Sequence, residues 1–377
     1  MSDSVTKSTF NVGVVGYGLS ATVFHIPFIS VTPSFKLHSI LQRDPSKSSL
    51  SAPRDHPTLK HFTALDQFLA DPDLDVVVVT TPPQTHFSFA QKALLAGKHV
   101  LVEKPFVPSA AEADALVNLA KEKGRLICVY QNRRWDSDFL TVRKLLADES
   151  KLGRIVEFET HFDRFRLEKP TNWKGSLGID QGGSALYDLG THLIDQVYVL
   201  FGMPQSVFAI LSSQRDGLFV GPQQPNLEPD SFTVQLFYES GLVAFARAAV
   251  VSAEVRQPRF WIRGTKGSYR KAGLDSQEPQ LRSGMKTDDA NFGRENAEWN
   301  GKLTLVGDNG DFQEQDCPNV EPETYSKIYE LFGQAIVHNR EQDVPVPASQ
   351  ARDVLRIIEA AKESARNRRE IELSQRT

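Results

Sequence analysis

The feature that most constrains the fold is a short apolar run followed by a glycine-rich turn, at residues 11–27. Val12, Val14 and Val15 predict a buried strand, and the run continues into Gly16-Tyr17-Gly18-Leu19-Ser20-Ala21 and then a segment that can form a helix. This is a G-x-G-x-x-A pattern, in which the first glycine permits a tight turn and the second a close approach to the backbone. The N–H groups of the helix would bind a pyrophosphate, so the stretch predicts a dinucleotide site. The alternative is a glycine-rich turn without a ligand.

The rest of the first 132 residues alternates between apolar runs and helical patterns. Continuous apolar runs bounded by turns are typical of buried parallel strands. The alternation predicts an α/β domain with a doubly wound parallel sheet, whose ligands bind at the carboxyl ends of the strands. The further strands are expected at 35–41, 75–80, 99–102 and 126–130, and the helices at 63–69, 87–96 and 109–123.

The end of the second expected strand bears on the choice of cofactor. An acidic residue here takes the ribose hydroxyls of NAD, whereas an arginine accommodates the 2′-phosphate of NADP. The strand ends Leu41-Gln42-Arg43-Asp44, with no acidic residue at its tip. Arg43 therefore favours NADP(H), with NAD(H) as the second possibility. The alternative is that Arg43 is only a solvated loop charge.

The pattern changes after about residue 132, to strands of antiparallel type with few helices. This predicts a second, α+β domain with a large, mainly antiparallel sheet. We expect domains at 1–132 and 133–377, with the final helix, 349–366, a candidate for packing back on the first domain. The expected strands are 155–165, 206–213, 231–238, 242–250 and 260–264; helices are expected at 136–146 and 183–201, and long loops at 217–229 and 275–300.

Composition excludes several classes of function. The chain has 377 residues and a formal net charge of −4, which gives no general attraction to nucleic acid or to an anionic membrane. It contains no apolar run long enough to span a bilayer, and its first ten residues lack the apolar core of a signal peptide. Cys128 and Cys317 are far apart and have no metal-ligand spacing. We therefore expect a cytoplasmic protein without nucleic-acid or membrane partners.

Two further stretches carry candidate chemistry. Lys104 stands at a strand tip between Glu103 and Pro105, where it would meet a ligand or, alternatively, only a structural ion pair. Asp188 and His192 are four residues apart on an expected helix, so the carboxylate could orient the imidazole as a general base. The alternative is a satisfied polar pair on the helix surface. Zinc is not favoured, because Asp188 and His192 supply only two ligands, and His161 and Asp195 are not placed to complete a recognisable zinc-binding set.

The order of motifs resembles that of the Gfo/Idh/MocA family of sugar and polyol oxidoreductases. It runs through G-x-G-x-x-A, then T-P-P-x-T-H at 81–86, E-K-P at 103–105 and G-G-x-x-L-x-D-L-G-x-H at 182–192. Residues 23–28, 131–140 and 161–166 are similar to the YdgJ/YvaA-like branch, which includes NADP-dependent scyllo-inositol dehydrogenases. The resemblance covers nearly the whole chain, with a Rossmann domain first.

The resemblance implies an NAD(P)-dependent dehydrogenase that moves hydride between nicotinamide and a hydroxyl-bearing carbon of a cyclic polyol or sugar. The family's catalytic residues fall on Lys104, Asp188 and His192, so the active site is expected to draw on both domains. The implied cofactor residues are Gly16, Tyr17, Gly18, Leu19, Ser20, Ala21, Arg43, Thr80, Pro83, His86, Glu103, Lys104 and Asn132. The implied substrate residues are Asn132, Arg164, Arg166, Trp173 and His192.

The same resemblance leaves other properties as expectations. It points to a homodimer or homotetramer formed through the sheet of the second domain, and no metal is expected. Members of the family also include non-catalytic, dinucleotide-binding regulators of sugar pathways, and that function is the alternative. Arg164 could equally serve only in packing.

Overall fold

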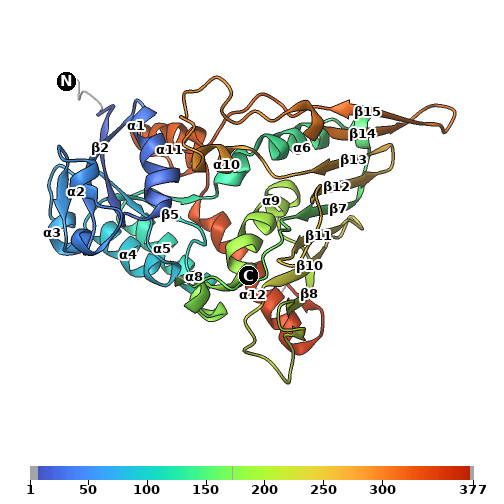
Figure 1. Ribbon diagram of the computed structural model, residues 1–377, viewed down its shortest axis with the longest axis horizontal. Coiled ribbons are helices and arrows are strands. Elements are labelled where there is room, and N and C mark those ends of the chain that lie inside the picture. The colour runs from blue at the N-terminus through green and yellow to red at the C-terminus, as the bar shows by residue number, and fades with distance from the viewer. Residues whose placement is uncertain (1–6, 172, 374–377) are drawn as a thin grey trace. The chain divides into compact units, whose positions relative to one another are not determined.

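The computed structural model describes residues 7–171 and 173–373 (Figure 1). The chain forms two compact units, each of which takes several segments of the sequence. Unit 1 comprises residues 1–132, 278–292 and 323–352, and unit 2 comprises residues 133–277, 293–322 and 353–377.

Unit 1 contains the parallel sheet that the sequence predicts, but with six strands in the described residues, because the short edge strand β3 was not expected. The strand order is β3-β2-β1-β4-β5-β6, so the chain reverses direction across the sheet between β1 and β4. The four valines of β4 are all buried, which explains its unbroken apolar sequence. The strands are β1 (Phe10–Val15), β2 (Phe35–Leu41), β3 (Lys60–Phe62), β4 (Val76–Val79), β5 (His99–Glu103) and β6 (Ile127–Tyr130).

Short helices connect the strands of unit 1. Ser109 accepts a hydrogen bond from the backbone N–H of Glu112 and so caps the start of α5. A π-helical turn, Ser20–His25, precedes α1 and follows the glycine-rich turn. The helices are α1 (Ile26–Val31), α2 (Ala52–Asp55), α3 (Leu65–Leu69), α4 (His86–Leu95) and α5 (Ala110–Glu122).

A further helix of unit 1, α11 (Ser326–His338), is absent from the sequence-based expectations. Its buried side chains include Ile328, Phe332 and Ile336, which recur at the spacing of one helix face. The helix packs on α1 and β2, where the ring of Tyr329 stacks on that of Phe28 at a centroid distance of 6.1 Å. The apolar period was therefore present in the sequence but was not recognised.

Unit 2 contains a sheet of ten strands, of which only the β7–β11 pairing is parallel. The prediction of a large, mainly antiparallel sheet is confirmed. The path is β15-β14-β13-β12-β7-β11-β10-β8-β16, with β9 beside β8. The strands are β7 (Ile155–His161), β8 (Ser206–Ser213), β9 (Leu218–Phe219), β10 (Ser231–Phe237), β11 (Val243–Ala248), β12 (Pro258–Gly264), β13 (Gly267–Ala272), β14 (Gly301–Val306), β15 (Phe312–Cys317) and β16 (Ile371–Glu372).

Several expected boundaries in unit 2 were wrong. The strand expected to reach residue 165 ends at His161, and beyond it Phe165 forms only an isolated bridge with Val251. β13, β14 and β15 were not expected, because polar residues interrupt their apolar pattern. The short helix α10 (Gln277–Arg282) lies in the region expected to be an irregular loop. The other helices beyond residue 132 are α6 (Ser137–Ala147), α7 (Glu149–Leu152), α8 (Trp173–Ser176), α9 (Thr191–Phe201) and α12 (Ala348–Asn367).

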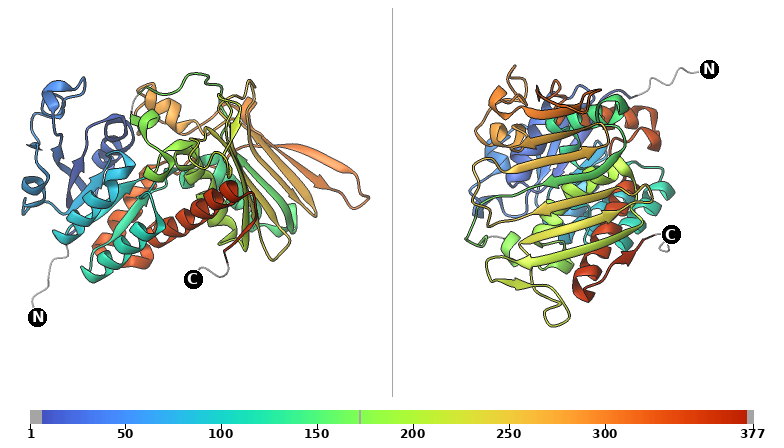
Figure 2. Two further views of the ribbon diagram at one scale, coloured as in Figure 1. Left: turned by 90° about the horizontal axis from the view of Figure 1, so that it is seen from below. Right: turned by 90° about the vertical axis from the view of Figure 1, so that its right-hand side faces the viewer.

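The two faces of the ten-stranded sheet differ. Burial alternates along β10 and β11, and α9 packs against the more buried face, where Phe201 contacts Phe158. The right-hand view of Figure 2 shows the opposite face, which no described helix of unit 2 covers. Trp261 on this face is 41% exposed and Ile210 is 38% exposed. No described helix is long and apolar enough to cross a membrane.

Buried charge connects the elements of unit 2. Arg259 on β12 is fully buried, and its Nε lies 2.9 Å from a carboxylate oxygen of Asp138 on α6. The same guanidinium donates to Thr160 on β7 and to Gln196 on α9, at 3.0 and 3.1 Å. Nearby, the ammonium of Lys271 lies 3.0 Å from Glu295. Such groups are retained in an interior only when they are paired in this way.

We expect the stability of unit 2 to fall as the pH rises from 5 to 8. Burial raises the pKa of Glu295 to about 7, even though Lys271 opposes the shift. The pKa of a glutamate in an unfolded chain is about 4.3, so between this pKa and that of folded Glu295 the folded chain binds more protons than the unfolded chain. The free energy of unfolding should therefore decrease by roughly 1–3 kcal/mol over this range, as measured by urea denaturation.

The matched variant for this experiment is Glu295→Gln, which removes the titrating group. Its unfolding free energy should depend less on pH between 5 and 8 than that of the unsubstituted protein. An equal slope in both proteins would contradict the assignment to Glu295.

Candidate active site

In unit 1, the residues expected to bind the cofactor gather at the carboxyl edge of the parallel sheet. β1 leads into the glycine-rich turn, β4 into Thr80, β5 into Lys104 and β6 into Asn132. Because the strands are parallel and adjacent, their carboxyl ends share one edge. The structure thus brings together most of the residues that the sequence indicated for this role.

The start of the glycine-rich turn is hydrogen-bonded to residues at the ends of the neighbouring strands. Gly16 has a φ of +97° and donates its N–H to Leu41 at 2.9 Å. The hydroxyl of Thr80 donates to the carbonyl oxygen of Val15 at 3.0 Å, so Thr80 braces the turn. By contrast, a Cβ placed on Gly18 would meet no heavy atom within 4 Å. The chain therefore presents an open backbone surface at the second glycine.

The other members of the turn differ in exposure. Leu19 is 50% exposed, whereas Ala21 is fully buried beneath the start of the π-helical turn. The hydroxyl of Tyr17 donates to Asp55 at 3.1 Å. Burial and the neighbouring carboxylate raise the pKa of Tyr17 to about 12, so its hydroxyl stays protonated.

Glu103 is a buried carboxylate at the tip of β5. Oε1 accepts hydrogen bonds from Ser20 and from His25, the latter at 2.9 Å, and Oε2 accepts the backbone N–H of Lys104 at 2.9 Å. Although burial opposes ionisation, the hydrogen bond from His25 lowers the pKa of Glu103 to about 2. Lys104 itself is half-buried, and the peptide bond to Pro105 is cis.

Pro83 and His86 lie in the T-P-P-x-T-H segment after β4, and both are buried. His86 Nε2 lies 2.7 Å from the carbonyl oxygen of Thr81, and Nδ1 lies 3.0 Å from that of Pro105. Burial lowers the pKa of His86. These contacts hold the loop after β4 to the segment that follows Lys104, and a role of His86 in cofactor binding stays a prediction.

Arg43 lies in an exposed loop directly after β2. Its neighbour Gln42 fixes this loop, because Nε2 donates to Leu50 at 2.7 Å and Oε1 accepts from Ala52 at 2.8 Å. The loop that carries Arg43 is therefore anchored where it leaves β2, and the Gln42 side chain ties that point to residues 50–52.

In unit 2, Asp188 and His192 lie on consecutive helical segments, but not on one regular α-helix. In the structure, the helix expected at 183–201 begins at Ser184. Its residues Leu186–Gly190 are wound as a π-helix, and the regular helix α9 begins at Thr191. The expected α-helical register of the two residues was therefore wrong in detail. π-Helical turns occur frequently at functional sites. His192 is buried, whereas the side chain of Asp188 is 34% exposed.

The expected substrate residues are only partly brought together. Arg164 Nη2 lies 3.9 Å from a carboxylate oxygen of Asp188, and its guanidinium lies over the ring of Phe162. Arg166 is exposed, and Asn132 of unit 1 is buried. Trp173 begins α8, but its side chain lies outside what the structure describes.

Comparison with known proteins assigns the chain to a family. Residues 10–131 match "Oxidoreductase family, NAD-binding Rossmann fold", and residues 143–373 match "Oxidoreductase family, C-terminal alpha/beta domain". The chain belongs to the Gfo/Idh/MocA oxidoreductase family.

Relatives from several organisms match along nearly the whole chain. An uncharacterized oxidoreductase of Schizosaccharomyces pombe is 39% identical over 96% of this chain and 98% of its own length. The scyllo-inositol 2-dehydrogenase (NADP(+)) IolW of Bacillus subtilis is 36% identical, covering 97% of this chain and 96% of its own. The structure of the putative oxidoreductase YvaA from Bacillus subtilis superposes with a TM-score of 0.86 at 35% identity, over 97% of this chain and 100% of that one.

The residues at the sheet edge of unit 1 fit the dinucleotide that the family binds. The open surface at Gly18 leaves room for a close approach, and the left-handed Gly16 turns the chain into the following helical segment. The turn 16–21 would hold the pyrophosphate through backbone N–H groups. This fit rests on backbone geometry rather than on any single charged side chain.

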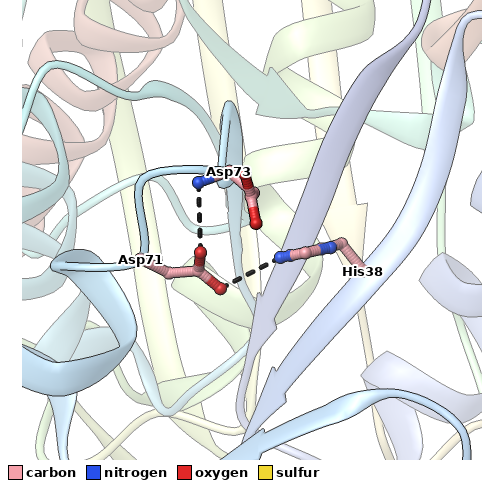
Figure 3. A group of neighbouring side chains, drawn as sticks. All are labelled: His38, Asp71 and Asp73. Carbon is pink, nitrogen blue, oxygen red and sulfur yellow. Dashed lines mark hydrogen bonds and ion pairs between the residues drawn. The ribbon is translucent and has the colours of Figure 1, made fainter.

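One group of side chains in unit 1 has the composition of a metal site. His38, Asp71 and Asp73 lie close together, and His38 Nε2 is 3.0 Å from Asp71 (Figure 3). The ammonium of Lys60 lies 3.0 Å from Asp71 and 3.1 Å from Asp73. A cationic side chain therefore already pairs with both carboxylates, and the cluster is explained as an ion-pair network.

Sequence reasoning assigned no role to His25 or Tyr329. His25 lies in the Val23–Phe28 stretch that supported the family resemblance, and this was the available signal. Tyr329 comes from the unrecognised helix α11, and its hydroxyl lies 2.7 Å from His25 Nδ1. Arg134 and Asp195 were also missed as a pair; they form a buried bidentate ion pair at 2.8 and 2.7 Å.

Gly18→Ala should separate cofactor binding from folding. The new methyl group meets no protein atom, so the melting temperature should stay within about 2 °C, while the affinity for NAD(P)H should fall by about tenfold or more because the pyrophosphate approach is obstructed. Fluorescence titration measures the affinity, and thermal denaturation measures the stability.

Gly16→Ala is the contrasting variant. The positive φ and the hydroxyl of Thr80, which would lie 2.9 Å from the new methyl carbon, should lower stability by about 1–3 kcal/mol. Undiminished cofactor affinity in Gly18→Ala would contradict the proposed path of the pyrophosphate.

Proposed function

We propose that the protein is an NADP(H)-preferring dehydrogenase that acts on a hydroxyl-bearing carbon of a cyclic polyol or sugar. The observation that carries the proposal is that the chain contains Lys104, Asp188 and His192, the three residues to which the family resemblance assigns the catalytic roles. The relative IolW, whose name describes an NADP(+)-dependent scyllo-inositol 2-dehydrogenase, supports an inositol-like substrate. Screening inositols and aldoses by NADPH absorbance, with both cofactors, tests the substrate class.

The three residues divide the chemistry of the alcohol group. When bound, the nicotinamide supplies or accepts the hydride. In the oxidative direction His192 takes the proton of the reacting hydroxyl as general base, and in reduction it returns that proton. Lys104 donates a hydrogen bond to the same oxygen and stabilises its developing negative charge. Asp188 orients the imidazole and raises its basicity.

Polar side chains would select the substrate. Arg164 and Asp188 are oppositely charged, 3.9 Å apart and both about one-third exposed, so a substrate hydroxyl group can reach both side chains. Asn132, Arg166 and Trp173 complete the proposed substrate set. A polyol requires several directional polar groups of this kind.

Catalysis should fail in a characteristic order when the three residues are replaced. His192→Ala should lower kcat about 10²–10⁴-fold through loss of the acid–base group. Lys104→Ala should lower kcat much more than it weakens NADPH binding, because the charge that it stabilises develops only during reaction. Asp188→Asn should cost less than His192→Ala. Steady-state kinetics and fluorescence titration measure these effects.

Full activity of purified Lys104→Ala would overturn this mechanism. A wild-type protein that binds NADPH but turns over no polyol or sugar would instead favour the non-catalytic regulator of the same family.

The preference for NADP(H) is proposed from Arg43. Arg43→Ala should weaken NADPH binding by roughly 1.5–3 kcal/mol and leave NADH binding nearly unchanged, since one charge-assisted hydrogen bond to the 2′-phosphate is lost. Titration calorimetry with both cofactors measures this difference. Equal affinity of the unsubstituted protein for NADPH and NADH would refute the preference.

We also propose that the uncovered face of the ten-stranded sheet forms a homodimer or homotetramer interface. Register pairs place Trp261, Phe245 and Phe208 in one row across this face, where they alternate with Glu159 and Gln235. Such faces are commonly buried in partners. Light scattering should give a dimer or tetramer, and Trp261→Glu should lower the mass; a monomer at micromolar concentration would contradict the interface.

A further inference from the structure

Glu103 connects two parts of the proposed cofactor site. Its Oε1 accepts the hydroxyl of Ser20, which begins the helical segment after the glycine-rich turn. Its Oε2 accepts the backbone N–H of Lys104. One carboxylate thus fixes the catalytic strand tip relative to the nucleotide-binding turn, across residues that are 83 positions apart in sequence.

His25 supports this carboxylate from the interior. The ring is fully buried, with Nε2 at 2.9 Å from Glu103 Oε1 and Nδ1 at 2.7 Å from the hydroxyl of Tyr329. A neutral imidazole satisfies both contacts in only one tautomer, in which Nε2–H donates to Glu103 and Nδ1 accepts from Tyr329. Burial raises the pKa of Tyr329 well above its ordinary value, so the phenol keeps the proton that it donates.

The aromatic surroundings keep the imidazole in this orientation. The ring of Tyr130 lies 4.3 Å from that of His25, centroid to centroid, and its hydroxyl donates to the carbonyl oxygen of Phe24 at 2.8 Å. Tyr329 is in turn stacked on Phe28. The imidazole is therefore confined by packing as well as by hydrogen bonds.

We propose that His25, Tyr329 and Glu103 act as positioning residues, which hold the Lys104 segment and Ser20 in register for reaction. The inference rests on the proposed function, because it assigns catalysis to Lys104. None of the three needs to touch the substrate: Tyr329 fixes the tautomer of His25, His25 holds Glu103, and Glu103 holds the backbone at Lys104. A displacement of about 1 Å at such a group can cost about 10²-fold in rate.

Two substitutions of His25 distinguish this role from packing. His25→Gln can donate to Glu103 and accept from Tyr329, so kcat should stay within about fivefold of the unsubstituted value. His25→Leu fills the apolar space without polar contacts and should lower kcat by about tenfold or more. In both variants NADPH affinity should change less than about threefold. If His25 only filled space, kcat of His25→Leu would be at least as high as kcat of His25→Gln. That result would overturn the proposal.

Glu103→Gln tests the carboxylate itself. The amide offers one acceptor oxygen to three donors, so at least one of Ser20, His25 and Lys104 loses its partner. We expect kcat to fall about 10–100-fold, and NADPH affinity to fall by a smaller factor because Ser20 belongs to the nucleotide-binding turn. Tyr238→Phe is the matched control, because it removes a tyrosine hydrogen bond to a carbonyl oxygen, that of Gly202, within unit 2.

Hydrogen exchange provides a readout that does not need turnover. In Glu103→Gln and His25→Leu, the peptide spanning residues 99–107 should exchange about tenfold faster, whereas a peptide spanning β6 should be unchanged. Tyr238→Phe should alter neither. Unchanged exchange at 99–107, or equal acceleration across the sheet, would overturn the positioning role. Selective acceleration in a protein that turns over no substrate would uphold it and refute the proposed function alone.

Discussion

The pairing of β1 with β2 on one side and β4 on the other is the constraint on which the candidate site depends. Because all three strands run in the same direction, the turn after β1 emerges at the point where the strand order reverses. Hydrogen bonds from Gly16 to β2 and from Thr80 to β1 then fix the turn against both neighbours. Two residues further on, Gly18 leaves the backbone of the turn open to a ligand.

Local motifs in the sequence predicted much of unit 1. An unbroken run of valines is typical of a strand in a sheet that is covered on both faces. The glycine-rich turn needs backbone conformations that few residues tolerate. These are local requirements, so the residues themselves reveal them. Helix α11 was missed although Ile328, Phe332 and Ile336 have a helical period within the segment itself; only its packing against β2 depends on residues far away in the sequence.

The interior of unit 2 could not be predicted in the same way. Arg259 and Asp138 are separated by 121 positions, and nothing local to either residue indicates that they pair in the core. Likewise, the expected helix through Asp188 contains an inserted π-turn, which depends on what it packs against rather than on its own propensities. The family motif indicated Asp188 and His192 in the sequence, but it could not supply their local winding.

Unit 1 is built from segments that lie before and between segments of unit 2 in the sequence, so its parts are synthesised at different times. The edge strand β6 receives a backbone partner at Val346, and the imidazole of His25 receives its phenol from residue 329. Both arrive only after the chain of unit 2 up to residue 322 has been synthesised. A nascent chain on the ribosome would therefore expose the face later covered by α11 for most of translation. The nucleotide-binding unit, although first in sequence, completes its core among the last.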